Sequence, residues 1–99
     1  MLSVGAKGVI SVLANVAPRK THEMVEAYLA GNTEYARLLH HELFDLSKIL
    51  FVETNPIPVK TSLALMGMIR EEFRLPLCEM SEINRKKLIG VLKACDLLR

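Results

Sequence analysis

A short segment rich in β-branched residues, GVISVLANV (residues 8–16), has no partner in the rest of the sequence. Val9, Ile10 and Val12 crowd together in it, which is typical of a strand that is apolar on both faces, as in a buried parallel sheet. The backbone donors and acceptors of a buried strand must be paired. We therefore expect at most one short strand, over residues 8–13, whose neighbours lie outside this sequence or in another copy of it.

The rest of the chain has the pattern of four helices. Pro18 suits the first turn of a helix that ends at Gly31, a residue that accepts the left-handed conformation of a helix C-terminus. Asn32 or Thr33 can cap a second helix, which runs on to the NPIPVK segment (residues 55–60). Apolar residues recur in this helix at steps of three and four: Tyr35, Leu39, Leu43, Leu46 and Leu50.

The two prolines of NPIPVK either form a linker between modules or a rigid corner between packed helices. Pro56 ends the second helix, and Pro58 fits the first turn of a third helix that runs to about Met66. Ser81 then caps a fourth helix. One side of that last helix carries Leu88, Val91, Leu92, Cys95 and Leu98. The spacing of the prolines alone leaves both possibilities open, but a helix that starts at Pro58 favours the corner.

Composition predicts one small globular unit that buries apolar surface against something else. The chain has 99 residues, of which 51% are hydrophobic and 24% charged. A unit of this size leaves about a third of its surface unburied. The mean hydropathy of this chain, +0.25, is high for a protein that exposes so much surface to water. We therefore expect an oligomer for the isolated chain, because large exposed apolar patches are unusual on monomers.

The charge pattern argues against one class of partner, and the length of the apolar runs argues against another. Thirteen basic and eleven acidic residues are scattered along the chain, without the basic stripe and stacking aromatics of a nucleic-acid-binding protein. No apolar run reaches the ~18 residues that span a bilayer. We expect a soluble, cytoplasmic protein that binds neither nucleic acid nor membrane.

No catalytic or metal-binding constellation is visible. Adjacent histidines on a helix point about 100° apart and do not share one ion. Paired carboxylates in a loop indicate a solvated turn, and lysines without a desolvated pocket do not act as Schiff-base nucleophiles. Two isolated cysteines predict reduced, packed thiols rather than a metal or redox site. The residues concerned are His22, His40, His41, Glu71, Glu72, Lys7, Lys60, Cys78 and Cys95.

Several motifs, taken in order, resemble one enzyme family. GAKGVISVLANVAP, FVETNPIPVK, the FRLPL loop and the closing SEINRKKLIGVLKACDLL helix are similar to the C-terminal part of dihydrodipicolinate synthase, in the N-acetylneuraminate lyase superfamily. The similarity covers essentially the whole chain. It departs at Leu13, where family members commonly carry Thr or another small residue.

The resemblance implies a mainly α fold, a four-helix C-terminal fragment of a (β/α)8 TIM barrel. Residues 1–31 would be the last strand and helix of the barrel, and residues 32–99 a C-terminal helical extension. The family is a carbon–oxygen lyase that needs no cofactor or metal and condenses pyruvate with aspartate semialdehyde in lysine biosynthesis, through a lysine Schiff base and a tyrosine–threonine proton relay. Those residues precede the matched part, since a whole barrel needs ~250 residues.

The one substrate contact that the resemblance carries over is Ile10, which would face pyruvate through its backbone. Met1 would match an internal position, so the fragment alone is expected to be inactive. Two alternatives stay open. The chain is a free-standing helical interaction or oligomerisation module, or one half of a split enzyme that a second chain completes.

Overall fold

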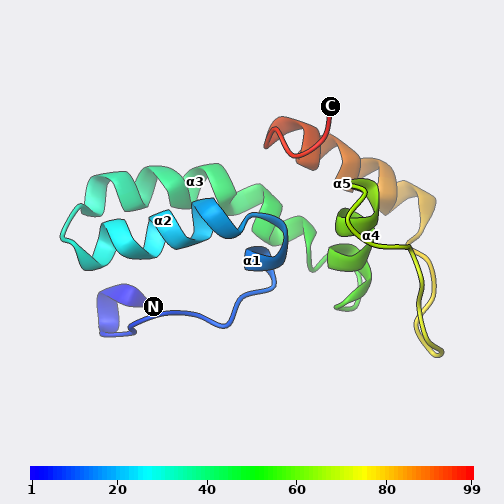
Figure 1. Cartoon of the computed structure of the whole chain (residues 1–99), viewed down its shortest axis with the longest axis horizontal. Helices are drawn as coiled ribbons and strands as arrows, with labels where there is room; N and C mark the ends of the chain where they lie inside the picture. Colours follow the sequence, from blue (N-terminus) through cyan, green and yellow to red (C-terminus); the bar gives the residue numbers. More distant parts are fainter.

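The computed structural model describes all residues, 1–99, and is entirely helical, with extents of 42 × 28 × 21 Å (Figure 1). A 3₁₀ turn and a one-turn helix precede four longer helices. In chain order the elements are η1 (Leu2–Val4), α1 (Leu13–Val16), α2 (Pro18–Leu29), α3 (Thr33–Ile49), α4 (Ile57–Leu65) and α5 (Glu82–Ala94). The four predicted helices are confirmed. None of the helices is long and apolar enough to cross a membrane.

Helices α2 and α3 form an antiparallel hairpin (Figure 1). Pro18 opens α2, and Gly31, with φ +86°, makes the sharp turn after it. The Asn32 side chain then caps α3 by accepting a hydrogen bond from the Tyr35 amide at 3.2 Å. These local signals fix the hairpin as the sequence predicted.

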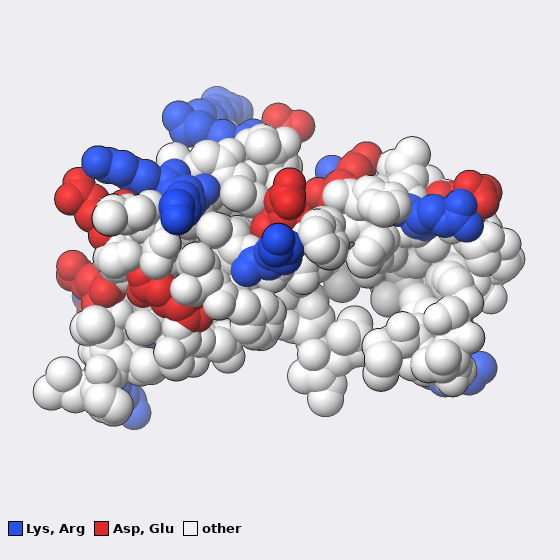
Figure 2. Space-filling model, turned by 180° about the vertical axis from the view of Figure 1, so that it is seen from behind, with Lys and Arg blue, Asp and Glu red and all other residues white.

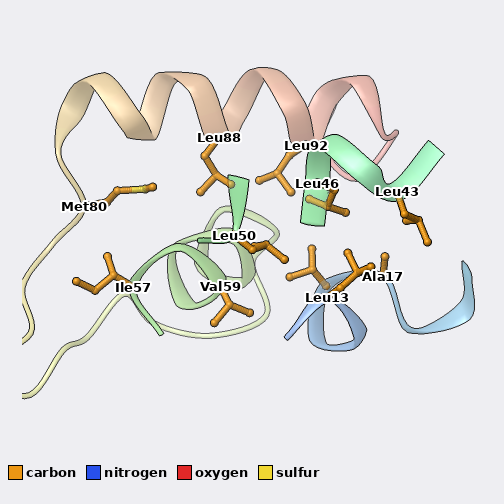
Figure 3. Close-up of a cluster of buried hydrophobic side chains, with 11 residues drawn as sticks. Leu13, Ala17, Leu43, Leu46, Leu50, Ile57, Val59, Met80, Leu88 and Leu92 are labelled. Carbon is orange, nitrogen blue, oxygen red and sulfur yellow. The ribbon is translucent and has the colours of Figure 1, made fainter. Parts of the chain in front are cut away.

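The core lies where α1, the second half of α3, α4 and α5 meet (Figure 3). Leu46 and Leu50 of α3 and Leu88 and Leu92 of α5 have no exposed surface at all. Four residues of the apolar face predicted for α3 are buried, and the fifth, Tyr35, is 42% exposed. The buried four are Leu39, Leu43, Leu46 and Leu50. The cluster contains Leu13, Val16, Ala17, Leu43, Leu46, Leu50, Ile57, Val59, Met80, Leu88 and Leu92.

Helix α3 ends at Ile49, several residues before the NPIPVK segment that was expected to end it. The amides of Phe51 and Val52 bond to carbonyls only three residues back, at 3.1 and 3.2 Å, which tightens the last turn. The following Thr54 and Asn55 favour turns over helix. Residues 50–56 therefore form a compact turn rather than a further helical turn.

The NPIPVK segment is a rigid corner, as predicted. Pro58 is buried in the first turn of α4, and Glu53 just before the corner ties it to α5. One oxygen of Glu53, Oε1, accepts hydrogen bonds from Ser81 N (3.1 Å), Ser81 Oγ (2.7 Å) and Asn84 Nδ2 (2.8 Å). These hydrogen bonds lower the pKa of the Glu53 carboxyl, and the bond from Asn84 has the largest effect. Ser81 also caps α5, by accepting from the Asn84 amide at 3.4 Å.

Candidate functional site

The predicted strand is not formed. Residues 6–11 belong to no helix or strand, and the segment from Leu13 to Val16 turns into α1 instead. Ser11 starts this turn, because its Oγ accepts a hydrogen bond from the Ala14 amide at 3.3 Å. A strand needs a neighbour for its ladder, and this chain offers none. The strand expected over residues 8–13 is therefore absent from the chain on its own, which agrees with the predicted limit of at most one short strand.

The segment from Lys7 to Ile10 has an unpaired backbone. None of its N–H or C=O groups makes a hydrogen bond within the chain. Its apolar side chains point into solvent, with Val9 63% and Ile10 107% exposed. This is the reverse of what β-branched residues usually do. The segment has the side chains of a core strand but is exposed like a loop. Its backbone N–H and C=O groups and its apolar side chains therefore have no partners within the chain.

A cavity of about 380 Å³ lies between this N-terminal segment and the α2–α3 hairpin. Met1, Leu2 and Val9 form one wall, and Met24 and Tyr28 of α2 lie on the other. Its polar groups are few, chiefly Thr33, Arg37 and His40. The cavity offers apolar contact and no acid–base pair or nucleophile.

Ile10, the one predicted substrate contact, follows Val9 directly but is not among the residues that line this cavity. Its backbone groups are free, as a contact through the backbone requires, and its side chain has no neighbour to pack against. Nothing in the chain itself brings a second polar group toward Ile10. The role of Ile10 in binding pyruvate remains a prediction.

Glu71 and Glu72 lie in the loop after α4, and Lys60 lies in α4 itself. The two carboxylates were expected to form a solvated turn, which is wrong for Glu71, because its side chain is only 22% exposed and is paired with Arg85. Glu71 Oε1 lies 2.5 Å from Arg85 Nη1 and accepts from Thr61 Oγ1 at 3.3 Å. The Arg85 guanidinium lowers the pKa of Glu71. Lys60 donates to the Glu72 carbonyl and lies 5.1 Å from the Phe73 ring centre. These contacts hold the loop onto α4 and α5.

Neither the Glu71–Arg85 pair nor the Glu53–Ser81 contact was predicted from the sequence. The members of these pairs are separated by 14 and 28 residues. Helical periodicity relates only residues three or four positions apart. Only the folded chain places them together.

The histidines and cysteines do not form a metal site. His40 and His41 have ring centres 5.4 Å apart, in an edge-to-face arrangement, and no three His, Cys, Asp or Glu side chains converge on one point. Cys95 is half-buried beside a cleft of about 620 Å³, and burial raises the pKa of its thiol. Cys78 is exposed, so the predicted packing role is wrong for it, because the loop around it projects from the fold.

Surface charge does not mark a polyanion-binding face. On the side of the molecule in Figure 2, Lys and Arg side chains are interspersed with Asp and Glu, and no continuous field of one sign forms. Several of these charges are paired along or between helices, such as Lys20 with Glu42 at 3.0 Å. Nucleic-acid binding relies on a concentrated basic surface, which this face lacks.

Comparison with known proteins agrees with the motif analysis. The model of the dihydrodipicolinate synthetase family matches residues 1–95. The chain is 54% identical over 99 residues to the 4-hydroxy-tetrahydrodipicolinate synthase of Thermodesulfovibrio yellowstonii, and 55% identical over 97 residues to that of Aquifex aeolicus. It covers 34% and 33% of these two proteins. The chain thus spans about a third of the length of the curated relatives it matches.

Solved structures show the same helical arrangement. The dihydrodipicolinate synthase of Thermotoga maritima superposes with a TM-score of 0.95 at 52% identity, over 98% of this chain and 33% of that one. The Aquifex aeolicus enzyme superposes with a TM-score of 0.94 at 54% identity, over 97% of this chain and 33% of that one. The all-helical fold is that of a C-terminal fragment of the barrel enzyme. By sequence and by structure, this chain belongs to the dihydrodipicolinate synthetase family.

Proposed function

We propose that the chain is the C-terminal part of a Schiff-base-forming lyase, which condenses pyruvate with aspartate semialdehyde in lysine and diaminopimelate biosynthesis in the cytoplasm. Family membership across residues 1–95 supports this proposal. The observation that carries it is the segment from Lys7 to Ile10, whose backbone is unpaired although its side chains suit a buried strand. A barrel would supply partners on both sides of the segment.

In this proposal the two parts of the chain have different tasks. Residues 1–31 provide the last strand and helix of the barrel, and residues 32–99 provide the helical extension that supports them. Ile10 presents its backbone to pyruvate at the C-terminal mouth of the barrel, where barrel enzymes place their active sites. The lysine that forms the Schiff base, and the tyrosine that moves protons, come from the preceding part of the enzyme.

The chain on its own is then inactive. A Schiff-base lysine needs a desolvated pocket that depresses its pKa. Lys60 is tied to the Glu72 carbonyl and Lys7 lies in the open N-terminal segment. The complete enzyme is a homo-oligomer in this proposal, because the apolar loop tip at Leu75, 92% exposed, needs cover.

A chimeric enzyme tests the proposal. The matched third of the Thermodesulfovibrio yellowstonii enzyme is replaced by this chain, to which it is 54% identical. We expect condensation within about tenfold of the parent rate, which corresponds to about 1.4 kcal/mol in the barrier. Borohydride should also trap a pyruvate adduct on the chimera, detected by mass spectrometry.

The parent enzyme without its matched third, and this chain alone, serve as controls, and both should be inactive. A chimera that folds, as judged by circular dichroism, yet forms neither product nor adduct contradicts the proposal.

The alternative function is a free-standing helical interaction module. One observation favours it: the core of α1, α3, α4 and α5 closes without any contribution from residues 1–11. An inactive chimera would therefore leave this module as the better account. Activity on mixing this chain with a separate upstream part would instead support a split enzyme.

A further inference from the structure

The backbone of Ile10 is fixed by the turn that follows it. No backbone group from Lys7 to Ile10 makes a hydrogen bond within the chain, whereas hydrogen bonds begin again at the next residue, Ser11. In a barrel, neighbouring strands would hold the segment along its length. Barrel active sites lie at the C-terminal ends of the strands, so the turn after Ile10 lies next to the site where pyruvate would bind.

The side chain of Asn15 closes this turn. Its Nδ2 donates to the Val12 carbonyl at 3.1 Å and, more weakly, to the Ser11 carbonyl at 3.5 Å. The backbone N–H of Asn15 donates to the same Val12 carbonyl, also at 3.1 Å. The Ser11 hydroxyl oxygen accepts from the Ala14 amide at 3.3 Å. One side chain therefore holds the next two carbonyls along the chain after that of Ile10.

This contact requires a hydrogen-bond donor at position 15. Backbone carbonyls only accept hydrogen bonds, and in the side chain of asparagine only the NH₂ group donates. Aspartate has nearly the same shape, but it would turn a charged oxygen toward two carbonyl oxygens. The turn therefore distinguishes asparagine from aspartate, although Asn15 is exposed.

Helix α1 is itself held in place by the core. Leu13 and Val16 are buried, at 9% and 2% exposure, and belong to the main hydrophobic cluster (Figure 3). Asn15 takes no part in this cluster. Its side chain instead joins the backbone that leads out of the open segment to a helix that the core immobilises.

We infer that Asn15 is a positioning residue for the contact between Ile10 and pyruvate. The inference rests on the proposed function, in which the Ile10 backbone faces that substrate. Asn15 acts without touching pyruvate: it restrains the peptide groups that follow Ile10 and so keeps the Ile10 backbone in one orientation. A turn that is already ordered loses little conformational entropy when the substrate binds.

Substitution of Asn15 by alanine in the chimeric enzyme tests the inference. Asn15→Ala removes both side-chain hydrogen bonds and should lower kcat/KM for pyruvate about 3- to 10-fold. The value of kcat/KM for aspartate semialdehyde should stay within about twofold, because that substrate reacts after the step in which pyruvate is bound. Steady-state kinetics with each substrate varied in turn measures both constants.

Two further substitutions separate the donor from the shape of the side chain. Asn15→Asp keeps the shape and replaces the donor by an acceptor, so it should lower kcat/KM for pyruvate further than Asn15→Ala does. Asn15→Ser restores a donor, because a serine hydroxyl in a helix can bond to a carbonyl three or four residues back. It should recover kcat/KM for pyruvate to within about twofold of the unsubstituted chimera.

Asn84→Ala on α5 is the matched control for a purely structural effect. It removes the 2.8 Å hydrogen bond to Glu53 at the corner before α4. This substitution should lower the unfolding midpoint of the chimera, yet leave kcat/KM for both substrates within about twofold. If Asn15 acted only through overall stability, the two alanine variants would share one kinetic pattern, which would contradict the inference.

A second measurement uses the chain alone and needs no activity. In nitrogen-15 relaxation, Asn15→Ala should reduce the order parameters of the amides from Ser11 to Ala14 from about 0.8 to below about 0.6, and Asn84→Ala should leave them unchanged. Unchanged order parameters in Asn15→Ala would overturn the inference. So would full kcat/KM for pyruvate in that variant of an active chimera, with the proposed function intact. An unsubstituted chimera that folds but is inactive would instead contradict the proposed function, and this inference with it.

Discussion

Replacing Leu46 with alanine should lower the free energy of unfolding by about 3 kcal/mol. Leu46 has no exposed surface and belongs to the cluster where α3 meets α1 and α5 (Figure 3). The substitution removes apolar contacts and leaves a cavity that close-packed neighbours fill only in part. A domain of this size has a total stability of about 5 to 15 kcal/mol, so much of it would be lost.

Urea unfolding followed by far-ultraviolet circular dichroism measures this change. Leu38→Ala on the same helix is the matched control, because Leu38 is half exposed. It should change the stability by no more than about 0.5 kcal/mol. Equal unfolding midpoints for the two variants would contradict the assignment of Leu46 to the centre of the core.

Ile10→Pro in the chimeric enzyme should reduce kcat/KM by about 100-fold, which corresponds to about 2.7 kcal/mol. Proline has no N–H and fixes φ, so it breaks the ladder of a central strand. It also shifts the backbone that we propose to face pyruvate. Ile10→Val keeps the backbone and the β-branched shape, and should retain activity within about threefold.

Steady-state kinetics with pyruvate as the varied substrate compares the two variants. Circular dichroism of the chimeras separates loss of the local backbone contact from loss of the fold. If Ile10→Pro is folded and as active as Ile10→Val, the segment is neither a central strand nor a pyruvate contact.

The helices were predictable because their signals are local. Pro18 and Gly31 mark the ends of α2, and the Asn32 and Ser81 caps open α3 and α5 as expected. The leucine spacing in α3 identified its buried face. Each of these signals depends on residues within about one helical turn. The early end of α3 was missed because the turn after it is formed by backbone hydrogen bonds between residues only three positions apart.

The strand could not be predicted from the segment that would form it. Strand preference describes which side chains suit a pleated, buried surface, and the partner strands must be supplied by the rest of the fold. Here the β-branched side chains of Val9 and Ile10 are present and the partners are not. Backbone pairing is therefore lost, and Leu13 enters α1 and the core instead.

The candidate site was predicted through motif resemblance rather than through chemistry. Ile10 contributes no side-chain chemistry, so no pattern of titratable or nucleophilic residues could point to it. Conversely, Lys60, Glu71 and Glu72 have reactive side chains, yet the side chains of Lys60 and Glu71 hold a loop in place, and Glu72 contributes only its backbone carbonyl. Sequence reasoning set these three aside correctly, without identifying Arg85 as the partner of Glu71.

Amide hydrogen exchange at Val9, Ile10 and Ser11 tests the central claim most directly. In the chain alone, these amides have no hydrogen-bond acceptor and should exchange at nearly the rate of an unfolded peptide. In the chimeric enzyme, pairing with strands on both sides should slow them at least about 1,000-fold, the protection typical of a core strand. Equally fast exchange in both proteins would show that the segment joins no sheet, and would contradict the account.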